Sequence, residues 1–239
     1  MKYMGSKARH AKEILPIITY FRRPDQWYVE PFCGGCNIVD KVTGLRIAAD
    51  NHYYLIAMWK ALQQGWTPPK IVVESEYQHI KEHKGECNPA LVGYAGFALS
   101  FGAKWFGGYR RDVAGTKGSY TNMKKQSGTA YRSIMRQIPK LKDVIFQCCN
   151  YQELSIPESS IVYCDPPYRN TTKYKSGDFD HDLFWNWVRN ISKQGHKVFV
   201  SEYTAPDDFR CVWSKVVHNT LVKDTGAKQG IERLFVLGG

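Results

Sequence analysis

The stretch IVYCDPPY, residues 161–168, joins a short apolar run to a rigid corner. Residues 161–164 are apolar and end abruptly, which is typical of a strand buried inside a sheet. The two prolines that follow cannot continue a sheet, because proline lacks a backbone N–H. The stretch therefore predicts a stiff turn at the carboxyl end of a strand, where Asp165 and Tyr168 are presented together.

This corner carries the groups that an amino group on a nucleobase would need. An adenine amino group offers two N–H donors, and the carboxylate of Asp165 and the carbonyl of Pro166 can accept both. The nitrogen lone pair would then face an electrophile, while Pro167 stiffens the turn and Tyr168 stacks on the ring. A purely structural alternative is a Pro-Pro turn with a capping aspartate. The preceding strand favours the catalytic interpretation, because it is the context that such a motif requires.

Segments on both sides of this corner predict an alternating α/β fold. Strands are expected at residues 27–32, 45–49, 144–149, 161–164 and 197–201, and then at 212–222 and 233–237, which could pair antiparallel. Helices are expected at residues 7–20, 53–64 and 180–194, the last between Asp180 as its N-cap and Gly195. This alternation is typical of a doubly wound, Rossmann-like sheet, which binds ligands beyond the carboxyl ends of its strands.

The central part of the chain breaks this rhythm and is strongly basic. We expect residues 65–142 to form an inserted, mostly helical subdomain, and residues 1–64 and 143–239 to form the main domain. The chain carries a net charge of +11, and residues 104–142 alone hold ten Lys or Arg and one acid, a net charge of +9. A localised basic surface suits a polyanion, whereas the alternative is a surface that only serves solubility. Interleaved rings able to stack on bases favour nucleic acid: Trp105, Phe106, Tyr109, Tyr120 and Tyr131.

A glycine-rich corner, EPFCGGC at residues 30–36, closes the first predicted strand. Its glycines would let a ligand approach the backbone closely, although a tight turn that needs positive φ explains them equally well. Asp50 lies sixteen positions after Gly34, at the end of the next predicted strand. A carboxylate there can accept hydrogen bonds from ribose hydroxyls, and the pair Asp50-Asn51 could also cap the helix that begins at Tyr53.

The N-terminal motif Tyr3-Met4-Gly5-Ser6-Lys7 adds a third candidate. Gly5 and Ser6 allow a tight turn, after which Lys7 opens a helix. The helix dipole disfavours a lysine at that position, so an anionic partner such as a carboxylate would rationalise it.

Taken in order, these motifs resemble the N6-adenine DNA methyltransferases of the alpha group, the DNA adenine methylase type. That family carries aromatic-x-Gly-Gly-Lys, then Pro-Phe-x-Gly-x-Gly, an inserted target-recognition domain and Asp-Pro-Pro-Tyr. Residues 101–111 also resemble the family's aromatic-Gly-Tyr-Arg segment at the DNA face. Two positions depart from the pattern: Ser6 stands for a glycine, and Cys36 stands for the last glycine of the cofactor loop. A requirement for positive φ at residue 36 would weaken cofactor binding.

The resemblance implies S-adenosylmethionine as cofactor, with S-adenosylhomocysteine as its product. It implies cofactor contacts from Tyr3, Lys7, Asp50 and Asp165, with Phe32 and Gly34 lining the pocket, and a catalytic turn of Asp165, Pro166, Pro167 and Tyr168. The expected reaction is methyl transfer to the N6 amino group of an adenine flipped out of double-stranded DNA. The expected DNA contacts are Arg110, Arg111, Lys124, Lys125 and Arg132.

Two other functions stay open at this point. One is methylation of a different amino group: cytosine N4, RNA or a protein side chain. Family members that act on cytosine tend to have serine, and those that act on glutamine tend to have asparagine, at the position of Asp165, so this residue favours adenine. The other is a DNA-binding relative without activity, for which Cys36 is the hint.

Several classes of protein are disfavoured. Seven cysteines without a disulfide-like framework favour a reducing cytoplasm, and the resemblance implies that of a bacterial cell or a phage-infected host. No apolar run approaches the roughly 20 residues that span a bilayer, so no membrane partner is expected. Neither Cys33 with Cys36 nor His79 with His83 is read as a metal site, and Trp185 and Trp187 are read as core residues. We expect a monomer or a weak dimer.

Overall fold

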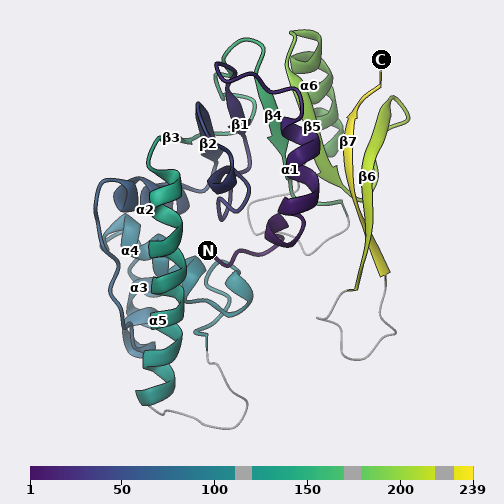
Figure 1. The fold of residues 1–239 in the computed structure, drawn as a ribbon. Helices are drawn as coiled ribbons and strands as arrows, with labels where there is room; N and C mark the ends of the chain where they lie inside the picture. Colours follow the sequence, from purple (N-terminus) through teal and green to yellow (C-terminus); the bar gives the residue numbers. More distant parts are fainter. Residues whose placement is uncertain (111–119, 170–178, 219–228, 239) are drawn as a thin grey trace.

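The computed structural model describes the backbone of residues 1–110, 120–169, 179–218 and 229–238. A seven-stranded sheet with strand order β3-β2-β1-β4-β5-β7-β6 forms its centre (Figure 1). β1 to β5 pair in parallel, and β7 pairs antiparallel with both β5 and β6. The strands are β1 (Tyr28–Glu30), β2 (Arg46–Asp50), β3 (Val144–Cys148), β4 (Ile161–Cys164), β5 (Lys197–Glu202), β6 (Phe209–His218) and β7 (Gln229–Leu237).

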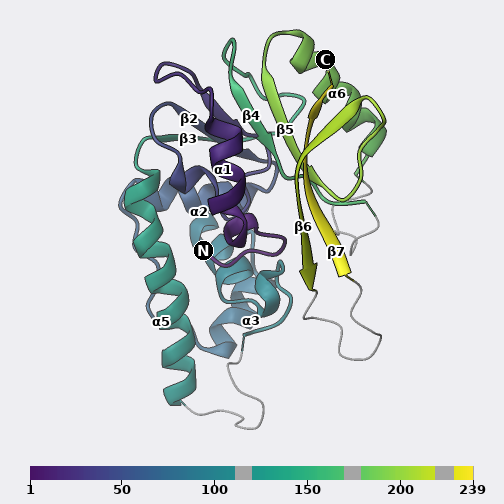
Figure 2. The same ribbon diagram turned by 45° about the vertical axis from the view of Figure 1, so that its right-hand side comes forward.

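Helices cover both faces of the sheet, which confirms the doubly wound architecture (Figure 2). Alternate residues of each strand face opposite sides, so in β4 Tyr163 packs into the cluster with α1 and α2, whereas Val162 packs into the cluster with α6. Between β1 and β4 the register places Val29 beside Val162. The main helices are α1 (Ala11–Thr19), α2 (Tyr53–Gln63), α3 (Glu74–Glu82), α4 (Pro89–Gly93), α5 (Tyr120–Gln137) and α6 (His181–Lys193).

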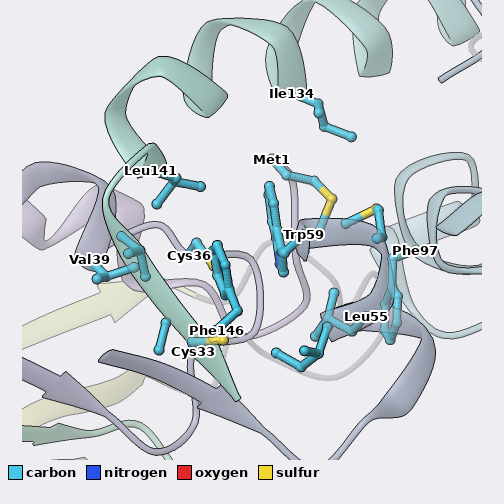
Figure 3. Close-up of a cluster of buried hydrophobic side chains, with 14 of the residues drawn as sticks. Met1, Cys33, Cys36, Val39, Leu55, Trp59, Phe97, Ile134, Leu141 and Phe146 are labelled. Atoms are coloured by element: carbon cyan, nitrogen blue, oxygen red, sulfur yellow. The ribbon is translucent and has the colours of Figure 1, made fainter. Parts of the chain in front are cut away.

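The described residues include five short 3₁₀ or π-helical segments, and residues 65–142 contribute three of these together with α3, α4 and α5. The short segments are η1 (Lys7–Arg9), η2 (Val39–Lys41), η3 (Tyr94–Ala98), η4 (Phe101–Ala103) and η5 (Ile138–Leu141), of which η1 and η2 belong to the first 64 residues. Buried side chains of this region share one hydrophobic cluster with the sheet: Phe97 and Ile134 lie in it with Trp59 and Phe146 (Figure 3). A single core therefore runs from the sheet into the helical region.

Most expected elements are present, and several differ at their ends: β7 begins at Gln229, four residues earlier than expected, and β1 is shorter than expected. The expected helix over residues 7–20 is divided into η1 and α1 at His10, because the N–H of His10 donates to Lys7 O in a short 3₁₀ turn. β6 begins at Phe209, three residues earlier than expected. The expected antiparallel pairing of the last two strands is confirmed. Among the described residues, no helix is both long and apolar enough to cross a membrane.

Candidate active site

The three sequence motifs meet at the carboxyl edge of the parallel sheet. β1 lies between β2 and β4, so the segments that follow these three strands emerge side by side. Asp165 follows β4, the glycine loop (residues 33–36) follows β1, and Asp50 ends β2. In open α/β sheets this edge is where ligands bind.

Lys7 connects the N-terminal motif to the turn after β4. Its ammonium group lies 2.9 Å from Asp165 Oδ1 and donates to Gly5 O at 3.0 Å. The side chain of Lys7 is 7% exposed and that of Asp165 is 21% exposed. The carboxylate partner that the position of Lys7 called for is therefore present, and Asp165 keeps part of its surface accessible to a ligand.

Tyr168 lies against the same lysine. Lys7 Nζ is 4.3 Å from the centroid of the Tyr168 ring, and the Tyr168 hydroxyl donates to Glu232 Oε2 at 2.8 Å. Tyr203 packs edge-on against the ring, with centroids 4.7 Å apart. A base that stacks on Tyr168 must use the ring face that Lys7 leaves free, or displace Lys7.

The charges at this corner depend on one another. Burial raises the pKa of Asp165, and the nearby Lys7 offsets part of that increase. Burial also opposes the charge on Lys7, but Asp165 and Glu232 outweigh this effect and the pKa of Lys7 is raised. The charge on the lysine therefore favours the ionised form of the Asp165 carboxylate, next to a half-buried aromatic ring.

Tyr3 explains why the glycine loop contains two consecutive glycines. A Cβ placed on Gly34 would lie 2.5 Å from Tyr3 Cε1, and one placed on Gly35 would lie 2.6 Å from Tyr3 Cβ. Gly34 also adopts φ +45°. Both explanations that the sequence offered apply here: the turn needs positive φ, and a group approaches the backbone closely, although that group is a side chain of the chain itself.

Asp50 holds the glycine loop rather than capping a helix. Its Oδ2 accepts from the N–H of Gly34 at 3.1 Å, and its Oδ1 accepts from the N–H of His52 at 3.0 Å. The expectation that Asp50-Asn51 caps α2 is wrong: the N-cap is His52, whose ring accepts from the N–H of Leu55. Burial raises the pKa of Asp50 to about 6, and the two backbone N–H groups oppose that increase. Each carboxylate oxygen retains a lone pair that a ribose hydroxyl could use.

The remaining residues of these motifs range from fully buried to partly exposed. Phe32 is half-buried and its ring lies 5.4 to 5.9 Å from those of Tyr151, Phe184 and Phe179, on the α6 face of the sheet. Pro166 is buried and Pro167 is partly exposed. Cys36 is fully buried and adopts φ +54°, so the position that departs from the motif does require a left-handed backbone.

A comparison with known families decides what this arrangement belongs to. The model of the D12 class N6 adenine-specific DNA methyltransferases matches residues 3–88 and 107–229. The chain belongs to this family. A structural comparison finds SMU.472, a proposed methyltransferase complexed with SAH, at 11% identity and a TM-score of 0.38. That match covers 100% of this chain and spans 54% of the other protein.

The residues that we expected to contact DNA are only partly described in this member of the D12 family. Arg110 is half-buried, and Arg132 on α5 is exposed, with Nη2 3.3 Å from Thr129 Oγ1. Lys124 and Lys125 belong to α5, but their side chains lie outside the described part, as does Arg111. Trp105 and Phe106 are half-buried among His52, Tyr54 and Phe97. The assignment of DNA contacts stays a prediction.

Two pairs of residues, one of cysteines and one of histidines, have a spacing that could suggest a metal site. Cys33 and Cys36 are both buried free thiols, and burial raises the pKa of each. The His79 and His83 rings stack with centroids 4.4 Å apart on α3. Among the described residues no group of three or more His, Cys, Asp or Glu is placed to hold a metal ion. Trp185 is buried and Trp187 packs against the same cluster, as expected.

Two carboxylates that the sequence did not reveal lie at the same corner of the sheet. Glu232 on β7 accepts from Tyr168 and lies 3.8 Å from Lys7 Nζ. Glu202, at the end of β5, accepts from the N–H of Arg169 at 3.1 Å and from that of Tyr203 at 2.7 Å. Burial raises the pKa of Glu202 to about 7, although these two N–H groups oppose the increase. In the sequence, each of these two residues is recognisable only as an acid next to an expected strand. Acids at such positions are common.

Proposed function

We propose that this D12 methyltransferase is a site-specific DNA methyltransferase of the alpha group. It transfers a methyl group from S-adenosylmethionine to the N6 amino group of an adenine flipped out of duplex DNA. The observation that carries the proposal is the ion pair between Lys7 and Asp165. It brings the N-terminal motif to the turn after β4, at the sheet edge where the glycine loop and Asp50 also lie.

The residues at this edge fit the cofactor. Asp50 offers free lone pairs on a carboxylate fixed by two backbone N–H groups, which suits the hydroxyls of a ribose. Tyr3 and Phe32 would line the site beside Gly34, with Lys7 and Asp165 at its far side. When bound, the cofactor supplies an activated methyl group on a sulfonium. With a pKa of about 6, Asp50 is mainly ionised at neutral pH, and hydrogen bonds from ribose hydroxyls would favour this form further.

The turn after β4 orients the acceptor amino group. Asp165 accepts one N–H of the adenine and the Pro166 carbonyl accepts the other, so the nitrogen lone pair points toward the donor. Lys7 favours the ionised form of Asp165 and fixes its position. Because the amino nitrogen of adenine is conjugated with its ring, catalysis depends mainly on positioning and hydrogen bonding. Tyr168 stacks on the flipped base, and such stacking contributes roughly 1–3 kcal/mol toward the cost of extrusion.

The experiment is a methylation assay with Asp165→Ala and a matched control. Duplex DNA is incubated with labelled S-adenosylmethionine and digested to nucleosides, and the modified base is identified. We expect N6-methyladenine from the wild type, and a loss of at least about 10²–10³-fold in rate for Asp165→Ala, as for removal of one oriented catalytic group. Binding of S-adenosylhomocysteine, measured by calorimetry, should fall less. Asp207→Ala, which removes an exposed acid, should retain activity.

The possible outcomes separate the alternatives. Full activity of Asp165→Ala contradicts the role of that residue. N4-methylcytosine, or a methyl group on RNA only, contradicts the adenine assignment but not methyl transfer. Binding of S-adenosylhomocysteine without methylation of any nucleic acid would favour an acceptor on a protein side chain, whereas DNA binding without binding of S-adenosylhomocysteine would indicate a relative without activity.

A further inference from the structure

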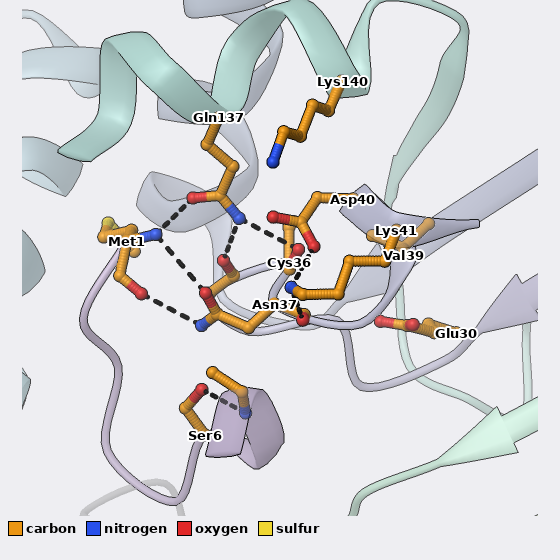
Figure 4. A network of polar contacts seen from close by, with 12 residues as sticks. Met1, Ser6, Glu30, Cys36, Asn37, Val39, Asp40, Lys41, Gln137 and Lys140 are labelled. Atoms are coloured by element: carbon orange, nitrogen blue, oxygen red, sulfur yellow. Dashed lines mark hydrogen bonds and ion pairs between the residues drawn. The ribbon is translucent and has the colours of Figure 1, made fainter. Parts of the chain in front are cut away.

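Side chains from outside the glycine loop bond three consecutive carbonyls of it. Trp59 Nε1, on α2, donates to Gly34 O at 3.0 Å. Gln137 Nε2 donates to Gly35 O and to Cys36 O, at 2.9 Å each (Figure 4). Gln137 is the last residue of α5, about a hundred positions further along the chain. The loop is therefore shaped by groups that the local sequence does not contain.

The orientation of the Gln137 amide is fixed by its partners. Both loop groups are carbonyls, so only the amide NH₂ can bond them. The amide oxygen in turn accepts from the amino group of Met1 (Figure 4). Gln137 is 4% exposed, so a change that removes the NH₂ would take away the donor that bonds the Gly35 carbonyl, and would leave the Cys36 carbonyl with only the N–H of Asp40, at 3.3 Å.

Cys36 makes the loop depend on this contact. It is the residue that departs from the family's glycine pattern, and its φ of +54° lies in the left-handed region that disfavours a side chain. Its N–H donates to Cys33 O at 2.7 Å, and its own carbonyl is one of the two that Gln137 bonds. A glycine would adopt this conformation without strain, whereas cysteine needs the surrounding bonds to hold it.

A second glutamine makes similar bonds nearby without touching the loop. Gln63 Nε2, on α2, donates to the carbonyls of Leu141, Lys142 and Val144 at 2.8 to 2.9 Å. Gln63 therefore bonds three carbonyls of the segment that follows α5, whereas Gln137 bonds carbonyls of the glycine loop. It provides a matched control.

We propose that Gln137 is a positioning residue for the cofactor: it holds the glycine loop in its binding shape and ties the carboxyl end of α5 to the cofactor site. This inference rests on the proposed function, because it takes the glycine loop as part of that site. Gln137 acts through the backbone of residues 35 and 36, and does not itself touch the reacting atoms.

The test compares Gln137→Met with Gln63→Met, since methionine keeps the length of the side chain and removes its donors. The dissociation constant for S-adenosylhomocysteine is measured by calorimetry and the stability by urea unfolding. We expect both variants to lose stability, but only Gln137→Met to bind S-adenosylhomocysteine more weakly, by about tenfold or more. Unchanged binding in Gln137→Met, or an equal loss in both variants, would overturn the inference. A wild type that does not bind S-adenosylhomocysteine would contradict the proposed function itself.

A rescue experiment distinguishes loop positioning from general damage. Cys36→Gly relieves the left-handed strain, so the loop should need Gln137 less. We expect Gln137→Met to weaken S-adenosylhomocysteine binding less in the Cys36→Gly background than in the wild type, a non-additivity typical of residues that act together. Equal losses in both backgrounds would show that Gln137 does not act through residue 36. Gln137→Glu, which keeps the shape and removes the donors, replaces Gln137→Met if the latter fails to fold.

Discussion

Three acidic residues at the carboxyl edge of the sheet differ chiefly in the groups that lie next to their carboxylates. Asp165 has an ammonium partner in Lys7, and Asp50 has two backbone N–H groups. Glu30, at the end of β1, is 3% exposed and accepts a bond from the Tyr28 hydroxyl at 2.8 Å. The same chemical group is therefore paired with an ammonium group in one place and is a core residue with a raised pKa in another. Environment, rather than residue type, separates these roles.

Glu30 makes stability depend on pH. Burial raises its pKa to about 8 from an ordinary 4.5. Between these values the folded chain keeps a proton that the unfolded chain has lost, so the free energy of unfolding falls as pH rises, by at most about 1.4 kcal/mol per pH unit. Glu30→Gln should remove this contribution. Urea unfolding from pH 5 to pH 8 should show a flatter curve for the variant than for the wild type. Parallel curves would mean that Glu30 ionises freely, and Glu82→Gln, at an exposed position on α3, is the control.

The elements were largely predictable wherever local chemistry decides them. β4 has the bounds expected from its apolar run, and Asp180 caps α6 by accepting from the N–H of Leu183. The division of the expected helix at His10 was not predictable from the local sequence. It accompanies the ion pair of Lys7 with Asp165, which lies 158 positions later in the chain. Gln137 and Glu232 were missed for the same reason. Their contacts depend on how distant elements pack, which no local pattern encodes.

The glycine loop is the element whose shape is most closely constrained. Gly34→Ala would add a Cβ at 2.5 Å from Tyr3 Cε1, on a backbone with φ +45°. Tyr3 would have to move away from the cofactor site. We expect this variant to lose S-adenosylhomocysteine binding as well as stability, measured by calorimetry and urea unfolding.

Gly65→Ala is the matched control for that variant, because Gly65 has φ +94° and open space around its Cβ position. It should cost only the left-handed strain, roughly 1 kcal/mol, and leave binding intact. If Gly34→Ala bound S-adenosylhomocysteine as tightly as Gly65→Ala does, the close approach of Tyr3 would have no role in the cofactor site.

In the molecule as a whole, the hydrophobic core extends through both the sheet and the helical region, whereas the positive charge is concentrated in one part of the chain. The hydrophobic cluster runs from the sheet through Trp59 to Ile134 on α5, so the helical region is packed onto the sheet through apolar side chains. The positive charge is concentrated in residues 104–142. Because α5 carries both a buried face and exposed arginines, including Arg132 and Arg136, DNA bound to it would be held at a fixed distance from the site.

This division predicts how binding responds to salt. Each phosphate contact releases counterions, so the logarithm of the binding constant for duplex DNA falls linearly with the logarithm of salt concentration. In one variant, three basic residues of α5 are changed to alanine: Lys124, Lys125 and Arg132. This variant should reduce that slope by about 0.9 for each phosphate contact removed. A control variant removes the same charge at three exposed positions elsewhere: Lys12, Lys193 and Arg210. It should keep the slope of the wild type. Fluorescence anisotropy with a labelled duplex measures both. Equal slopes for the two variants would mean that net charge alone attracts DNA and that α5 is not its binding surface.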